Sequence, residues 1–153
     1  MKIVIVSVGK KNDPALEVAV SDYSERLGRV IPVTWELIVP SGFDEPKARK
    51  HESQEIGAKL KPSDIVWVLD ERGKQLSSPA LAERINVMQY QGVQRLVFVI
   101  GGAYGVDDEL RARADTLWSL SELVFPHQIV RLLLAEQLYR ATEINRGSGY
   151  HHV

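Results

Sequence analysis

Two runs of five apolar residues constrain the fold of this chain more than any other feature of its sequence. The first run covers residues 65–69 and the second covers residues 96–100, and neither alternates between apolar and polar side chains. Such continuous runs are typical of strands that are covered on both faces, as in a parallel sheet. Between them, Ser78 and Pro79 begin an amphipathic helix that stops near Gly92. This segment therefore predicts a strand, a helix and a second, parallel strand.

The rest of the chain continues the same alternation of strands and helices. The apolar start of the chain predicts a strand, and Asp13 and Pro14 supply the N-cap and first position of a helix that ends at Gly28. The further expected elements are a half-buried strand over 33–39, a polar helix over 46–60, a short helix over 107–114, a strand over 116–120 and a final helix over 129–145. We expect an α/β fold, a mainly parallel sheet flanked by helices, in a single domain over residues 1–153.

The composition limits the possible functions. The net charge of -1 and the isoelectric point near 6.4 argue against a general nucleic-acid binder with a strongly basic surface, so any RNA contact has to be local. The chain has no cysteine, which excludes disulfides, thiolate metal sites and a thiol nucleophile. No segment reaches membrane-spanning length, and the start lacks a signal peptide's cleavage site. We therefore expect a soluble cytoplasmic protein with no membrane partner.

One segment has enough basic side chains for a local contact with RNA. Its basic residues are Lys47, Arg49, Lys50, His51, Lys59 and Lys61, with Glu45, Glu52 and Glu55 interleaved among them. A solvated helix face of mixed charge is the alternative interpretation of this segment.

The loops after the buried strands are the expected ligand-binding region, because ligands bind beyond the carboxyl ends of parallel strands. One expected loop covers residues 69–74. A second has the paired glycines Gly101 and Gly102, where a ligand can approach the backbone, although a tight turn is the alternative. A third, residues 119–128, leads into a helix start whose amides can face an anion, or is simply a buried connection. The glycines fit neither the dinucleotide nor the P-loop pattern, and no metal-ligand spacing occurs, so no metal is expected.

The final helix has an apolar arc wider than one core-facing stripe. We therefore expect one side to pack on the core and the other on a second copy of the chain, in a homodimer. Glu136 and Arg140 are four residues apart, with Glu143 three further on, which predicts an exposed ladder of ion pairs. Arg131 is expected on another part of the surface, where it could contact RNA phosphate.

Several short motifs together resemble the RlmH family of SPOUT methyltransferases over nearly the whole chain. They are Val8-Gly9-Lys10, Val99-Ile100-Gly101-Gly102, the stretch from Ser119 to Arg131, Glu136-Gln137-Leu138-Tyr139-Arg140-Ala141 and the terminal Tyr150-His151. The resemblance implies a SPOUT-type fold with a C-terminal trefoil knot, a homodimer, and S-adenosyl-L-methionine as the cofactor bound in the knot. The implied substrate is N3 of a pseudouridine in helix 69 of 23S rRNA, on assembled ribosomes.

The same resemblance assigns residues to the cofactor site. They are Leu69, Gly101, Gly102, Ser121, Glu122, Leu123, Val124, Phe125 and Pro126. The chain departs from the family where His152 and Val153 follow Tyr150-His151 in place of Arg or Lys, which makes the charge of the tail depend on pH. Ala103 and Tyr104 are a second departure and receive no role.

Methylation of a heteroatom is the expected reaction. Carbon methylation of a pyrimidine through a covalent adduct needs a nucleophile, usually cysteine, and the chain has none. Alignment of a ring nitrogen with the methyl donor can contribute about 7–11 kcal/mol. Our hypothesis is that His151 or Tyr150 orients the base or assists the loss of its imide proton, while Arg131 holds the RNA backbone. The alternative is that the tail only closes over the cofactor.

Two other classes of function stay open at this point. An RNA-binding module without catalytic activity is suggested by the basic segment, and it would not bind the cofactor. A small-molecule nucleotide enzyme is suggested by the parallel sheet and the glycine loop, and it would turn over without ribosomes.

Overall fold

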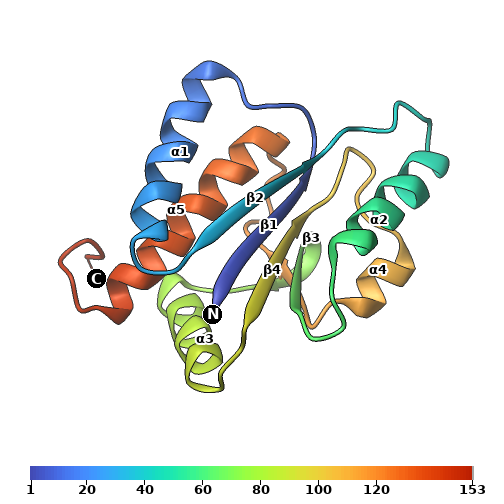
Figure 1. Ribbon diagram of the computed structural model, residues 1–153. Helices are drawn as coiled ribbons and strands as arrows, with labels where there is room; N and C mark the ends of the chain where they lie inside the picture. Colours follow the sequence, from blue (N-terminus) through green and yellow to red (C-terminus); the bar gives the residue numbers. More distant parts are fainter. Residues whose placement is uncertain (153) are drawn as a thin grey trace.

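The computed structural model describes residues 1–152, so Val153, one of the two residues behind the prediction of an unusual tail, lies outside the described residues. Strands and helices alternate along the chain (Figure 1). The strands are β1 (Lys2–Val8), β2 (Val33–Ile38), β3 (Ile65–Gln75), β4 (Arg95–Ile100) and β5 (Thr116–Ser119). The helices are α1 (Pro14–Gly28), α2 (Lys47–Lys59), α3 (Ser78–Tyr90), α4 (Asp108–Arg113) and α5 (His127–Asn145).

The five strands form one parallel sheet in the order β2-β1-β4-β3-β5. β4 lies at its centre, where Val97 is in register with Val4 of β1 and Val66 of β3. The predicted α/β class with a mainly parallel sheet is confirmed. Since all strands are parallel, their carboxyl ends lie at one edge, and this edge is where a ligand site is expected.

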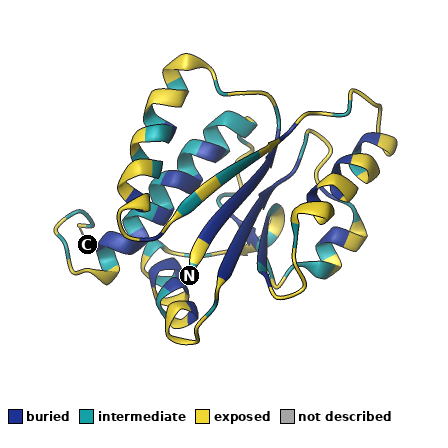
Figure 2. Ribbon diagram, viewed as in Figure 1, coloured by how far each residue is buried: buried dark blue, intermediate teal, exposed yellow. Residues whose placement is uncertain are grey.

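Helices cover both faces of the sheet (Figure 1). α1, α3 and α5 pack on one face through Leu27, Leu81 and Leu134, and α2 and α4 pack on the other through Ile56 and Leu110. Figure 2 shows the central strands buried between these two layers. Burial on both faces explains why β3 and β4 contain the continuous apolar runs.

The helix starts follow the predicted capping residues closely. The Asp13 carboxylate accepts a hydrogen bond of 2.9 Å from the Ala15 amide at the start of α1. At α3 the cap is Ser77, one residue before the predicted Ser78, and its hydroxyl accepts from the Ala80 amide at 3.2 Å. α5 begins at His127, two residues earlier than predicted.

The prediction of a loop over residues 69–74 is wrong. β3 continues through this segment to Gln75 and pairs with β5 on both sides of an irregularity between Leu69 and Lys74. Gly73 makes this possible, because a Cβ there would lie only 2.5 Å from the Leu117 carbonyl carbon and oxygen. The charged residues of the segment suggest a loop. Its structure is instead decided by the close approach of the β3 backbone at Gly73 to the β5 backbone at Leu117.

Candidate functional site

A cavity of about 570 Å³ opens beside the middle of β3 and at the carboxyl ends of β4 and β5. Small-molecule sites usually measure roughly 300–1,000 Å³. Three segments distant in the sequence form most of its wall. The first contributes Leu69, Asp70, Glu71 and Arg72, and the second contributes Ile100, Gly101, Gly102, Ala103, Tyr104, Gly105 and Val106. The third contributes Trp118, Ser119, Leu120, Ser121, Leu123, Val124, Phe125, His127 and Val130. Glu45 and Arg49 complete the wall.

Most of the predicted cofactor residues lie together on this cavity. The structure brings Leu69, Gly101, Gly102, Ser121, Leu123, Val124 and Phe125 to its wall. Glu122 and Pro126 do not line it, and Pro126 instead faces a second cavity. The geometric expectation, that three distant segments of the chain surround one space, therefore holds.

The paired glycines lie where side chains do not fit. A Cβ on Gly101 would meet Val106 Cγ1 at 3.0 Å and the Gly105 carbonyl carbon at 3.1 Å. A Cβ on Gly102 would overlap the carboxylate of Glu52. The sequence predicts room for a ligand here, and the structure adds a second reason for glycine, namely close packing beneath the loop.

Glu52 is a buried carboxylate under this loop that the sequence analysis missed. It is 5% exposed, although it lies in a helix of mostly charged residues. Its Oε1 accepts hydrogen bonds from the backbone amide and the hydroxyl of Ser41, while Oε2 is buried without a partner among the described residues. A spacing of four residues from the buried Ala48 and Ile56 was the available signal that Glu52 faces inward.

Charged side chains on the β3 wall form ion pairs with one another. The Arg72 amide and guanidinium donate to Asp70, and Arg111 of α4 lies 3.3 Å from the same carboxylate. Burial favours a higher pKa for Asp70, but the Arg72 hydrogen bonds and the two positive charges outweigh it and lower that pKa. Asp70 is therefore a firmly ionised, weakly basic carboxylate.

A second cavity of about 530 Å³ lies beside the N-terminal end of α5. His127 lines both cavities, because it is the first residue of α5 and lies between them. Burial is the largest cause of its lowered pKa, and the nearby positive charge of Arg131 lowers the pKa further. The negative charge of Glu52 raises the pKa but does not outweigh them. The other residues of the second cavity are Gly9, Lys10, Asp13, Leu16, Pro126, Gln128, Ile129 and Arg131.

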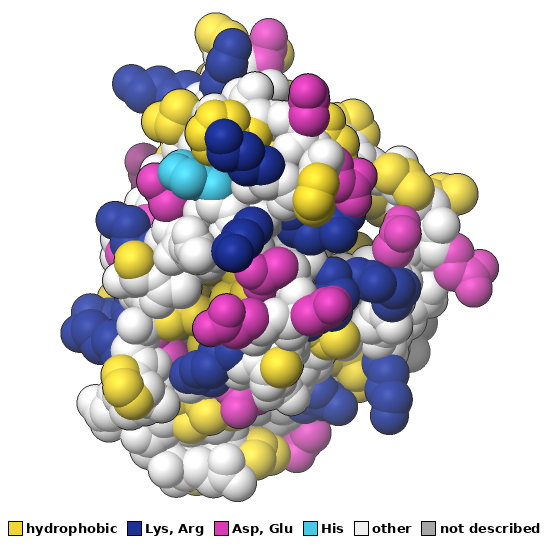
Figure 3. Space-filling view, turned by 90° about the vertical axis from the view of Figure 1, so that its right-hand side faces the viewer, with side chains coloured by type: hydrophobic (Ala, Val, Ile, Leu, Met, Phe, Trp, Pro, Cys, Tyr) yellow, Lys and Arg dark blue, Asp and Glu magenta, His cyan; other side chains and the backbone are white. Residues whose placement is uncertain are grey.

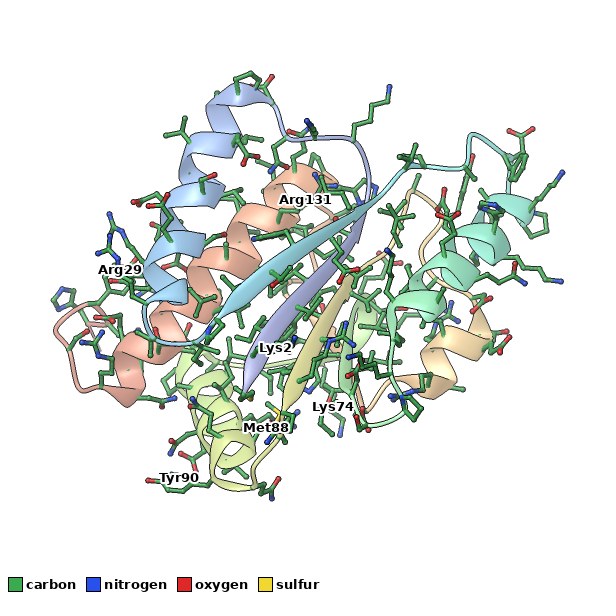
Figure 4. All side chains as sticks on the ribbon, viewed as in Figure 1. Lys2, Arg29, Lys74, Met88, Tyr90 and Arg131 are labelled. Carbon is green, nitrogen blue, oxygen red and sulfur yellow. The ribbon has the colours of Figure 1, made fainter. Side chains whose placement is uncertain are left out.

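The prediction that Arg131 lies on the surface is wrong. Its side chain is fully buried and points from α5 toward the loop between β1 and α1 (Figure 4). Its guanidinium donates to Ser7 Oγ at 2.8 Å, to the Lys10 carbonyl at 2.7 Å and to Asn12 Oδ1 at 2.9 Å. A helical wheel cannot show that a loop far away in the sequence closes over this position, so Arg131 holds the loop and is not available to a phosphate.

The two tail residues lie away from the cavity of their own chain. The Tyr150 hydroxyl lies 3.2 Å from Glu136 Oε1 and 3.4 Å from the Tyr23 hydroxyl. Burial and these two neighbours raise the pKa of Tyr150, which therefore stays protonated. His151 Nδ1 lies 3.4 Å from Arg140 Nη1. Neither tail residue is on the wall of either cavity.

The predicted ladder of exposed ion pairs is only partly right. Arg140 pairs with Glu136 at 2.6 Å, as predicted, but both side chains are largely buried against the tail. Glu143 is buried as well and pairs with Arg146. The tail folds back along α5 and covers this side of the helix, which helical spacing alone does not reveal.

The basic segment forms α2 and presents a mixed surface. Figure 3 shows basic and acidic side chains interspersed on the side of the molecule that includes α2 and α4. Arg49 is the member that reaches the cavity, where it donates to the Tyr104 carbonyl at 2.9 Å and pairs with Glu45. Lys47 lies 4.2 Å from the centre of the exposed Phe43 ring, and His51 packs edge-on against that ring.

Residues 1–152 contain no candidate metal centre and no candidate membrane-spanning helix. This part of the chain contains no group of three or more His, Cys, Asp or Glu side chains placed to bind a metal ion. None of its helices combines the length and the apolar character that a membrane crossing requires.

Comparisons with known proteins agree with the resemblance. Residues 1–151 match the family described as "Predicted SPOUT methyltransferase". Two relatives, each named ribosomal RNA large subunit methyltransferase H, come from Christiangramia forsetii, at 41% identity over 99% of both chains, and from Trichlorobacter lovleyi, at 40% identity over 99% of this chain and 100% of the relative.

A solved structure shows the same fold. It is a probable methylase family protein from Haemophilus influenzae, with a TM-score of 0.54 at 15% identity, and the match covers 99% of this chain and 70% of that one. The family match extends over nearly the whole chain, including all three segments of the cavity wall. This chain belongs to the SPOUT methyltransferase family and is an enzyme of the methyltransferase class.

Proposed function

We propose that this protein transfers a methyl group from S-adenosyl-L-methionine to large-subunit rRNA. The observation that carries the proposal is the single cavity formed by the segments around Leu69, Gly102 and Leu123. The names of the relatives support rRNA as the substrate. The finer proposal, N3 of a pseudouridine in helix 69 of 23S rRNA on assembled ribosomes, rests on the resemblance to the RlmH family.

The residues of the cavity fit S-adenosyl-L-methionine. Apolar side chains such as Ile100 and Leu120 suit an adenine ring, while the polar backbone and Asp70 suit a ribose and an ammonium group. The glycine loop brings backbone close to the cavity where a side chain would meet Gly105, Val106 or Glu52. The cofactor supplies a methyl group on a sulfonium centre, and the protein has to align a ring nitrogen with it. Glu122 and Pro126 are left out of the proposed contacts.

The proposal includes a homodimer, for two reasons. Apolar side chains stay uncovered in a single chain, since Leu123 is 70% and Val124 is 82% exposed, and Leu132 and Leu133 of α5 are only partly buried. Tyr150 and His151 do not reach the cavity of their own chain, so they can contribute to methyl transfer only at the site of a partner. Light scattering after gel filtration should give twice the 17.2 kDa chain mass.

The trefoil knot remains part of this proposal. The parallel sheet with β5 at its edge and α5 returning beneath β4 is compatible with a knotted path, and single-molecule unfolding tests it. A knotted chain pulled from both ends should retain a shortened contour length. Extension to the full contour length would show that the chain has no knot, and it would not affect the proposal for the cavity.

The functional test uses labelled S-adenosyl-L-methionine with assembled ribosomes and, separately, with isolated subunits. The proposal expects label in 23S rRNA of assembled ribosomes, with one added methyl group on a helix 69 pseudouridine by mass analysis. Labelling of subunits alone would overturn the on-ribosome proposal. A lack of label in either preparation, from protein that binds the cofactor, would overturn rRNA as the substrate.

A further inference from the structure

His127 is the one imidazole on the cavity wall among residues 1–152. His51 is exposed on α2, and His151 and His152 lie in the tail. His127 begins α5 and lies on the walls of both the proposed cofactor cavity and the cavity beside the β1–α1 loop. His127 is half-buried, and no hydrogen bond joins its ring to another side chain or to the backbone among residues 1–152.

The surroundings of His127 keep its ring neutral near pH 7. Burial lowers its pKa, and the buried Arg131 one turn along α5 lowers the pKa further. Glu52 of α2 acts in the opposite direction and does not outweigh them. The other charged groups around the ring are Asp70, Glu71 and Arg72 of β3, Glu45 and Arg49 at the α2 end of the cavity, and Lys10 and Asp13 of the second cavity.

The other candidates for a base at the cavity are weaker. Asp70 is bound by two arginines, and Glu45 pairs with Arg49. Glu71 is exposed, and carboxylates are in general weaker bases than imidazole. Tyr150 has a raised pKa, so its hydroxyl stays protonated and does not accept a proton even at the site of a partner. The neutral ring of His127 is therefore the base best placed for a proton that leaves the substrate.

On the basis of the proposed function, we propose that His127 accepts the proton that the target base loses during methyl transfer. The ring nitrogen of the base gives its proton to the free nitrogen of the His127 imidazole. The base nitrogen then forms a bond with the methyl carbon, and the carbon–sulfur bond breaks with its electron pair left on sulfur. The products are the N-methylated base, the thioether form of the cofactor and an imidazolium that returns its proton to water. The tail then keeps the separate task of orienting the base.

The first test compares His127→Gln with the wild-type protein. Glutamine keeps a polar side chain at the first position of α5 but cannot accept a proton. Single-turnover methylation of assembled ribosomes should slow by about 10²–10⁴-fold, the usual contribution of a positioned base. Calorimetric affinity for S-adenosyl-L-methionine should stay within about threefold, and thermal unfolding should show that the variant is folded. Tyr90→Phe, which changes an exposed side chain of α3, is the control and should methylate at the wild-type rate.

Further readouts separate a proton acceptor from a structural residue. The wild-type rate should decrease as the pH is lowered below the pKa of His127, which NMR titration of its ring measures. His127→Gln should lose this pH dependence. Added imidazole should restore part of the rate of His127→Ala. A wild-type rate in His127→Gln, or a pH profile that is unchanged by the substitution, would overturn the role of His127 while leaving the proposed function intact. An inactive wild-type protein would instead refute the proposed function.

Discussion

Replacement of Arg131 by methionine tests whether this side chain supports the fold or binds RNA. Methionine has a similar reach but no donor, so it removes a long 3.5 Å bond to the Val8 carbonyl and leaves the three closest acceptors without a partner. These are Ser7 Oγ, the Lys10 carbonyl and Asn12 Oδ1, at 2.7–2.9 Å from the guanidinium. All three belong to β1 or to the loop that follows it, and this loop forms part of the second cavity.

The expected loss follows from these contacts. A hydrogen bond to a charged group contributes about 1.5–3 kcal/mol net, so three of them amount to roughly 5–9 kcal/mol. Removal of a buried charge without an acidic partner returns several kcal/mol of desolvation free energy. We therefore expect Arg131→Met to lower the free energy of unfolding by about 3 kcal/mol, within the range of large single-residue effects.

Urea unfolding followed by circular dichroism measures this loss. Arg29→Met is the matched control, because Arg29 at the end of α1 is exposed and its side chain makes no ion pair among residues 1–152, so its variant should unfold with the wild-type midpoint. An unfolding free energy of Arg131→Met within about 1 kcal/mol of the wild type would refute the supporting role. Reduced ribosome binding with a smaller salt dependence and unchanged stability would instead restore the surface role that the sequence predicts.

Three more predictions follow from other contacts. Gly102→Ala should lower the free energy of unfolding by about 1–3 kcal/mol, because the added Cβ overlaps Glu52. Glu52→Ala in the same chain should recover part of this loss in a double-mutant cycle, and additive losses would contradict the overlap. Asp64→Asn should cost about 3–5 kcal/mol in urea unfolding, since it breaks the buried 2.6 Å pair with Arg95, and a wild-type midpoint would speak against that. His151→Ala should slow methyl transfer far more than it weakens calorimetric cofactor binding, and equal losses would remove its catalytic role.

The sequence predicts most of the fold because the fold depends on local signals. Continuous apolar runs mark β3 and β4, and capping residues such as Asp13 mark helix starts within one or two positions. The extension of β3 past Leu69 escapes prediction, because Gly73 acts through contact with the backbone of β5, a partner some forty residues away in the chain. Pairing across such a distance leaves no periodic trace in the sequence.

The candidate site divides in the same way. Two of its backbone segments are predictable because they follow β4 and β5, whereas the segment over 69–72 lies within β3. The resemblance to the RlmH family implies that the three form one site. The side chains are harder, since Arg131 and Glu52 lie in helices where their charge suggests solvent exposure. Both are buried because a loop closes over each of them, the β1–α1 loop over Arg131 and the β2–α2 loop over Glu52. His127 is visible in the sequence as the residue after Pro126, but the burial and the nearby Arg131 that lower its pKa are not.

Calorimetric titration with S-adenosyl-L-methionine tests the central claim most directly, namely that three distant segments form one cofactor pocket. We expect saturable binding of one molecule per chain. Leu123→Glu should weaken this binding without loss of stability, because Leu123 lies on the cavity wall and is 70% exposed, whereas Val18→Glu, at 73% exposure on α1, should bind as the wild type does. Absence of saturable binding, or equal affinities of the two variants, would show that these segments do not form a cofactor pocket.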